Sequence, residues 1–389
     1  MPLIDDSAER ARLRAIVREV ALAVESAPDT STRCQRAILR AYLAADDTLV
    51  DDDGAATAHV SAALAARSAG DPLALYGGLA EIGWTIAHLA DDAHAAQICA
   101  SIDDTLLRAL RDWRGNYDLV NGLVGFGVYA LERGEHGHRL VSRVLDWLEA
   151  TAEARGAGLA WHTPAAHLPS WQRAMAPDGY WNLGLAHGIA GIIALCARCV
   201  AADIDAARAR DLMRGAASYM LDVEPAAAEG RFASWHSRGG GTEGVRARLA
   251  WCYGDLGIAA ALTAAARVDV RWREAAHDLA RSCAMRTAPP GVHDAALCHG
   301  TAGIAHIFAR IAGAAEDAVL ATAARRWLSV TLELRTDHAY GGFPAFDGGT
   351  RGWRADASLV AGATGVALAL HAMVSEVEPL WDRTLLLDL

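Results

Sequence analysis

The sequence has 389 residues and no lysine, so all 36 of its basic residues are arginine. Chemistry that depends on a lysine amine, such as a Schiff base, a pyridoxal phosphate linkage or a P-loop, is therefore excluded. The formal net charge is −11, and the arginines form no basic cluster. We therefore expect no nucleic-acid partner.

We also expect no secretory signal, because residues 1–6 have neither a basic start nor an apolar core. Its seven cysteines make an odd number. We expect a cytoplasmic location with reduced thiols, where an important cysteine is a ligand or a reactive group. The uncharged stretch 179–197 contains Asn182, His187 and four glycines. We interpret it as a loop and a buried helix, not as a membrane span.

Long runs of alternating β-branched residues are absent as well, whereas helical periodicity is frequent. In residues 8–24 the apolar side chains fall on one face, and Ser7 precedes them as a candidate N-cap. The same pattern occurs in residues 139–149, 206–221, 272–285 and 316–334. The sequence predicts an all-α protein with one domain over 1–389.

An internal repeat organises these helices. Gly-x-x-Gly units begin at Gly122, Gly188, Gly254, Gly300 and Gly362, each at the start of an apolar run, and Gly78 begins a sixth copy in which Glu81 replaces the second glycine. Apolar helices need burial on all sides, while the amphipathic helices between them can face water. An α/α toroid of two concentric helix rings meets both demands. Small-residue packing in an ordinary bundle is the alternative.

Reactive side chains fall at matching offsets from the first glycine of each unit. Asn121, His187, Tyr253 and His299 lie one residue before it, Cys252 and Cys298 two before, Asp118 four before and Arg248 six before. If all the apolar helices start at one end of the toroid, these side chains converge there.

Two stretches do not follow the repeat, namely residues 155–181 and 230–244, which are rich in glycine with Trp or Arg. We expect both to be loops at the rim, where substrate contacts would lie. The stretch 155–181 is also a candidate for a small β-containing insert.

Cys252, Cys298 and His299 form a candidate zinc site. Two thiolates and one imidazole are preferred zinc ligands, and three protein ligands leave the fourth tetrahedral position open for catalysis. The alternative is that buried cysteines behave as small hydrophobic side chains. That alternative is favoured for Cys196 and Cys199, which have redox-motif spacing inside an apolar helix with no preceding strand.

Three further side chains are candidates for catalysis. His187 is a candidate general acid or base, with a buried structural imidazole as the alternative. Asp118 would orient His187 or cap a helix. Arg248 would hold a developing oxyanion or cover the rim with its aliphatic stem.

Three segments, taken in order, are similar to the signatures of a known family. Asn182-Leu-Gly-Leu-Ala-His-Gly-Ile-Ala-Gly191, Arg248-Leu-Ala-Trp-Cys-Tyr-Gly254 and Cys298-His-Gly300 resemble the lanthionine synthetase C family, the lanthipeptide cyclases. The resemblance runs from about residue 75 to residue 383. It implies a zinc-containing α/α toroid in which Trp251 and Tyr253 line the cavity.

The resemblance also implies a reaction, in which a peptide cysteine adds to dehydroalanine or dehydrobutyrine and closes a thioether ring. The partners would be a dehydrated precursor peptide, a lanthipeptide dehydratase and an export complex. Two alternatives remain open at this point. One is a zinc enzyme like the protein prenyltransferases, and the other is a non-catalytic protein of the same fold that binds zinc and a thiol such as glutathione.

Overall fold

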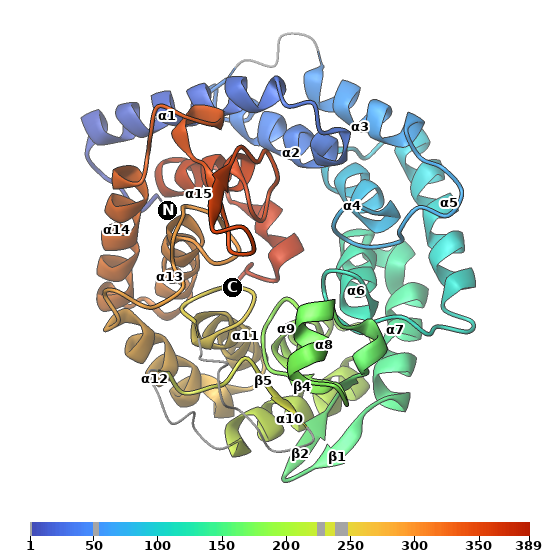
Figure 1. The fold of residues 1–389 in the computed structure, drawn as a ribbon. Coiled ribbons are helices and arrows are strands. Elements are labelled where there is room, and N and C mark those ends of the chain that lie inside the picture. Colours follow the sequence, from blue (N-terminus) through green and yellow to red (C-terminus); the bar gives the residue numbers. More distant parts are fainter. Residues whose placement is uncertain (1, 50–53, 224–229, 238–247) are drawn as a thin grey trace. The chain divides into compact units, whose positions relative to one another are not determined.

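The computed structural model describes residues 2–49, 54–223, 230–237 and 248–389. These residues belong to two compact units. Unit 1 comprises residues 1–71, 284–382 and 388, and unit 2 comprises residues 72–283, 383–387 and 389. Each unit is described below by itself, with the labels of Figure 1.

Unit 1 consists of helices and one short strand pair. Its helices are α1 (Ser7–Glu25), α2 (Arg33–Ala44), α3 (Ala55–Ala65), α13 (Thr301–Ala315), α14 (Ala318–Glu333) and α15 (Ala363–Val374). Strands β6 (Ala345–Asp347) and β7 (Gly352–Arg354) form an antiparallel hairpin. Helix α13 packs on α14, α1 on α15 and α2 on α3 (Figure 1).

Unit 2 contains most of the remaining helices and two small sheets. Its helices are α4 (Leu79–Leu89), α5 (Ala93–Ala109), α6 (Leu123–Glu132), α7 (His138–Ala150), α8 (Ser170–Met175), α9 (Ile189–Ala201), α10 (Ala206–Asp222), α11 (Asp255–Val268) and α12 (Arg273–Ala284). Strands β1 (Glu153–Arg155) and β2 (Gly158–Ala160) form a hairpin. Strands β3 (His162–Thr163), β4 (Tyr180–Asn182) and β5 (Trp235–Ser237) form a sheet in that order.

The apolar helices and the amphipathic helices differ in burial as the repeat predicts. Helix α9 buries eleven of its 13 residues, whereas α10, which packs on it, buries seven of 17. The buried residues of α10 recur at three- and four-residue spacing, so one face packs inward and the other faces water. Pairs of one enclosed and one half-exposed helix are therefore the building block of this unit.

The first glycine of every repeat unit is the N-cap of an apolar helix. Gly78 caps α4, Gly122 caps α6, Gly188 caps α9, Gly254 caps α11, Gly300 caps α13 and Gly362 caps α15. In the sixth copy the Glu81 carboxylate accepts a hydrogen bond from the Gly77 backbone N–H at 2.9 Å. The glutamate that replaces the second glycine of the repeat therefore helps to stabilise the start of α4.

Two of the predicted helix starts are displaced because an aspartate caps the helix. Asp6, rather than Ser7, caps α1, because its carboxylate accepts the Glu9 N–H at 2.8 Å. Helix α14 begins at Ala318 instead of residue 316, since Glu316 has φ 51° and the Asp317 carboxylate accepts the Val319 N–H at 2.8 Å. A carboxylate in an extended backbone caps a helix well, and composition alone does not locate it.

The stretch 155–181 is not only loop, because it contains β2, β3, α8 and most of β4, as expected for a small β-containing insert. Of the other predicted rim loop, 230–244, residues 238–244 lie outside the described residues, and residues 235–237 form the strand β5 instead of loop. The uncharged stretch 179–197 contains the predicted buried helix, the first part of α9, while the predicted loop before it includes the strand β4. In the described part of the chain, no helix combines the length and apolarity that crossing a membrane requires.

Candidate functional site

Close backbone contacts at the helix starts of unit 2 position the candidate catalytic residues. The chain folds back so tightly that a Cβ on Gly122 would collide with the Asn116 carbonyl oxygen, and a Cβ on Gly188 with that of Asn182. Only glycine fits such an approach. The residues just before each glycine are thereby held in a fixed turn at the N-terminal end of the helix.

Two of these turns bring Asp118 and His187 together. His187 Nδ1 lies 2.8 Å from Asp118 Oδ2. Asp118 Oδ1 accepts the Asn121 backbone N–H at 2.7 Å, so this carboxylate both closes its own turn and orients the imidazole. The Leu119 N–H donates to the Ala186 carbonyl oxygen at 3.1 Å and joins the two turns. The pairing that the repeat offsets predicted is therefore present.

The environment of this pair differs for its two members. The Asp118 side chain is 8% exposed and the His187 side chain is 29% exposed. Burial disfavours the charged imidazole, but the hydrogen bond to Asp118 and the negative charge of Asp118 outweigh it, so the pKa of His187 is raised. Asp118 occupies Nδ1, which leaves Nε2 as the nitrogen that can meet a ligand.

Tyr253 covers one face of His187. The two rings stack with centroids 5.4 Å apart and an interplanar angle of 23°. The Tyr253 hydroxyl oxygen accepts a hydrogen bond from Gln172 Nε2 at 3.2 Å, and Trp235 meets the same ring edge-on at 6.2 Å. Burial raises the pKa of Tyr253, so its hydroxyl stays protonated at neutral pH.

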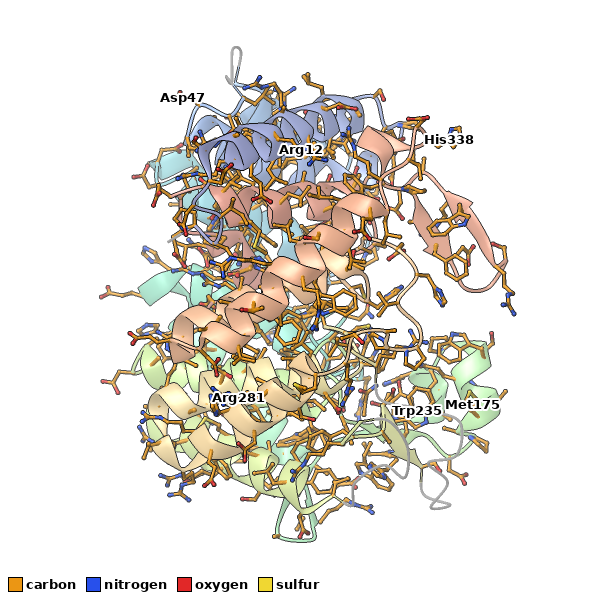
Figure 2. All side chains as sticks on the ribbon, turned by 90° about the vertical axis from the view of Figure 1, so that its left-hand side faces the viewer. Arg12, Asp47, Met175, Trp235, Arg281 and His338 are labelled. Carbon is orange, nitrogen blue, oxygen red and sulfur yellow. The ribbon has the colours of Figure 1, made fainter. Side chains whose placement is uncertain are left out.

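A cavity of about 340 Å³ lies within unit 2 above this pair. One side is formed by the helix-start turns and the other by the insert. Its lining comprises Asn116, Tyr117, Asp118, Asn121, Thr163, His167, Leu168, Pro169, Trp171, Gln172, Tyr180, His187 and Tyr253. Figure 2 labels Met175 at the end of α8 and Trp235 in β5. The Trp235 ring lies 6.3 Å from that of Trp171 in α8 and 5.2 Å from that of Tyr180 in β4. An apolar wall facing an imidazole and a carboxylate is typical of a small-molecule or peptide subsite.

The candidate metal ligands occupy equivalent positions in the two units. In unit 2, Cys252 lies two residues before Gly254, and its carbonyl oxygen contacts Gly184 so closely that no side chain fits there. In unit 1, the Cys298 backbone N–H donates to the Val360 carbonyl oxygen at 2.8 Å, and His299 directly precedes the α13 cap Gly300. Each of the three side chains offers one donor atom, a thiol sulfur or an imidazole nitrogen.

Trp251 and Arg248 are not among the residues that line this cavity. Trp251 is buried, its indole N–H donates to the Leu385 carbonyl oxygen at 2.9 Å, and its ring meets Tyr76 edge-on at 6.3 Å. Arg248 is exposed, and its backbone forms a bridge with Gly254 at the start of α11. Trp251 therefore packs within unit 2, and Arg248 is exposed to solvent.

Cys196 and Cys199 are packing residues, as predicted. Both lie fully buried in α9. Burial raises the pKa of Cys196 and raises that of Cys199 to about 12, so both thiols are protonated at neutral pH. Neither is a thiolate available for redox or metal chemistry.

Sequence reasoning missed the contribution of the insert. Gln172, Trp171 and Tyr180 all line the cavity, but none of them belongs to a repeat unit. The richness of residues 155–181 in tryptophan marked the segment, and nothing in the sequence distinguished these three residues within it. The position of these three side chains relative to His187 depends on how β4 pairs with β3 and β5.

Comparisons with known proteins agree with this arrangement. The family model of the lanthionine synthetase C-like protein matches residues 37–386. The solved structure of nisin cyclase matches with a TM-score of 0.78 over 98% of each chain, at 17% sequence identity. This likeness shows the fold, and the predicted class, an all-α protein of the α/α toroid type, is confirmed. No curated protein matches the chain.

Proposed function

Because the chain belongs to the lanthionine synthetase C-like family, we propose that it is a lanthipeptide cyclase. Its substrate would be a ribosomally made peptide that carries a cysteine and a dehydroalanine or dehydrobutyrine residue. The observation that carries this proposal is the His187–Asp118 pair in the lining of a cavity of about 340 Å³. Nisin cyclase, whose fold the chain shares, is named for a cyclisation reaction.

We also propose that Cys252, Cys298 and His299 hold one zinc ion. The donor set supports this assignment, since two thiolates and an imidazole fit zinc and leave one tetrahedral position for a substrate. The equivalent location of both cysteines, each two residues before a helix-capping glycine, supports it as well. A bound zinc ion would lower the pKa of a substrate thiol that reaches the open position.

The reaction is the net addition of S–H across a carbon–carbon double bond. The cysteine thiol loses its proton, its sulfur bonds to the β-carbon, and the π electrons move toward the adjacent carbonyl as an enolate. A proton must then reach the α-carbon. We assign to His187 Nε2 the transfer of this proton to the α-carbon or the uptake of the thiol proton, since Asp118 holds Nδ1 and its charge stabilises the imidazolium. No redox cofactor or nucleotide takes part.

The other predicted residues receive supporting roles in this proposal. Tyr253 lines the cavity and fixes the plane of the imidazole. Arg248 would stabilise the enolate oxygen when its exposed side chain turns toward the substrate. Since dehydroalanine arises by loss of water from serine, a dehydratase must act before this protein, and an export complex would act after it. A cytoplasmic location fits that sequence of reactions and the need for reduced thiols.

A ring-closure assay tests the function. The full-length protein is incubated with a linear peptide containing one cysteine and one dehydroalanine, and remaining thiols are counted by alkylation and mass spectrometry. We expect the alkylated fraction to fall, while a control peptide with alanine in place of dehydroalanine keeps its thiol. Alkylation that stays complete in the presence of the protein would contradict the proposal and favour a non-catalytic thiol-binding protein.

Metal analysis tests the zinc assignment separately. We expect about one zinc ion per chain in the wild-type protein and loss of that zinc in Cys298→Ala, because two remaining ligands bind zinc weakly. The matched control is Cys196→Ala, which removes a thiol buried in α9 and should leave the zinc content unchanged. Equal zinc in Cys298→Ala and the wild type would refute the ligand set.

A further inference from the structure

A buried glutamine of the insert connects two phenol groups beside the cavity. Gln172 lies in α8 and is 3% exposed. Its Oε1 accepts a hydrogen bond from the Tyr180 hydroxyl at 3.1 Å, and its Nε2 donates to the Tyr253 hydroxyl oxygen at 3.2 Å. The side chain therefore uses both ends of its amide, which is the usual condition for burying a glutamine.

The two tyrosines that it joins come from different elements. Tyr180 belongs to β4, whereas Tyr253 precedes α11. Tyr180 packs with Leu168, Ala176 and Trp235 in a small apolar cluster, against which the Tyr253 ring also rests. Apolar contact alone would let a phenol ring slide, while the amide sets the position of its oxygen.

The hydrogen bond from Gln172 to Tyr253 also affects the position of His187. That ring stacks on the imidazole, whose Nδ1 is held by Asp118. The imidazole is thus restrained at one nitrogen and on one face. The restraint on its face depends on the Tyr253 ring staying where Gln172 holds its hydroxyl.

We propose that Gln172 is a positioning residue, which acts through the Tyr253 hydroxyl to keep the His187 imidazole aimed at the cavity. Its kinetic consequence rests on the proposed cyclase function, whereas its effect on Tyr253 does not. Gln172 itself donates no proton to the reaction and makes no covalent bond. Loss of its amide should lower the rate of ring closure more than the affinity for the peptide.

A double-mutant cycle tests this dependence. We expect Gln172→Met and Tyr253→Phe each to lower kcat about tenfold with little change in KM, which is the upper range for one neutral hydrogen bond. The double variant should be no slower than Tyr253→Phe alone, because the amide then has no hydroxyl to hold. Losses that multiply in the double variant would overturn the proposal.

A second variant and a matched control separate positioning from general damage. Gln172→Glu keeps the size, and its carboxylate can accept hydrogen bonds from both the Tyr180 and the Tyr253 hydroxyls, so it should retain more of kcat than Gln172→Met. Gln35 in α2 is also buried, and its Oε1 accepts the Leu359 N–H at 2.6 Å. Gln35→Met should lower the melting temperature and leave kcat unchanged.

A measurement independent of activity uses the tyrosine doublet in the ultraviolet resonance Raman spectrum. The difference between wild type and Tyr253→Phe isolates the Tyr253 signal, which we expect to indicate a phenol oxygen that accepts a hydrogen bond. The same difference taken in the Gln172→Met background should shift toward a weaker acceptor. An unchanged doublet would refute the positioning role. A shifted doublet in a protein that closes no rings would refute the cyclase function alone.

Discussion

Two histidine–aspartate pairs in this protein have almost the same nitrogen–oxygen distance and different surroundings. In unit 2, His187 Nδ1 lies 2.8 Å from Asp118 Oδ2, and in unit 1, His306 Nε2 lies 2.9 Å from Asp382 Oδ2. The first histidine side chain is 29% exposed and lines a cavity, whereas the second is 1% exposed. The same pair of groups is therefore open to a ligand in one unit and enclosed in the other.

The enclosed pair also contacts an arginine and a tryptophan. Arg310 Nε lies 3.0 Å from Asp382 Oδ2, and the Trp381 ring stacks on His306 with centroids 4.8 Å apart. These contacts join α13 to the last residues of unit 1, so the pair serves to hold the chain together. A His–Asp hydrogen bond by itself therefore does not identify a catalytic site. Access to a cavity is what distinguishes His187.

The largest expected difference between the pairs is in activity. His187→Ala should lower kcat for ring closure by about a hundred- to ten-thousand-fold, the range for loss of a general acid or base. Its free energy of unfolding should change little, because this side chain is partly exposed. Steady-state kinetics and denaturant unfolding measure the two effects. His306→Ala is the counterpart, and we expect its folded fraction to keep normal kcat. Equal losses of kcat in both variants would contradict the view that only His187 of these two histidines takes part in catalysis.

The next difference is in stability. Asp382→Asn removes the charge opposite Arg310 in an enclosed network and should lower the free energy of unfolding by about 3 to 5 kcal/mol. Asp118→Asn should cost only about 1 kcal/mol, because the asparagine oxygen still accepts the Asn121 N–H. Urea unfolding of both variants gives the comparison. If Asp118→Asn proves the more destabilising change, the open pair has a structural role that its exposure does not reveal.

The glycine repeat made it possible to predict that Asp118 and His187 lie close together. A glycine is needed wherever the backbone six residues earlier approaches a helix start, as Gly122 and Gly188 show, so glycine spacing locates the turns. Residues at fixed offsets from those glycines then share similar positions. Asp118 and His187 could be paired from the sequence for this reason. His306 lies inside α13 and not in the turn before its capping glycine. The repeat offsets therefore did not predict its pairing with Asp382.

Other features depend on contacts that a repeat does not encode. Trp251 and Tyr253 lie two residues apart, yet Trp251 turns to Tyr76 and the Leu385 carbonyl oxygen while Tyr253 turns to His187. Which of the two reaches the cavity depends on the backbone of one turn. Gln172 reaches it only because β4 and α8 fold over the helix starts. Such tertiary contacts follow from packing, which composition and spacing do not specify.

A third pair, His88 and Glu132, extends the comparison to the pH dependence of stability, where we expect the smallest effect. His88 Nδ1 lies 2.8 Å from Glu132 Oε1 in unit 2, where the side chains are 8% and 7% exposed. Burial alone would raise the pKa of Glu132, but its hydrogen bond to His88 and the charges of His88 and Arg383 lower it below the ordinary 4.5. The unfolded chain therefore binds more protons at this position, so the stability from Glu132 is present above about pH 4.5 and is lost as the pH falls further.

Glu132→Gln should remove this part of the acid dependence of unfolding. The variant should be less stable than the wild type at neutral pH, and the gap should narrow as the pH falls below 4.5. Thermal unfolding across that pH range measures it, with Glu135→Gln as the exposed control in the same unit. A gap that stays constant with pH would mean that Glu132 contributes packing and no charge interaction. The enclosed His88–Glu132 pair would then stabilise the fold through packing. Proton transfer would remain the proposed role of the open His187–Asp118 pair.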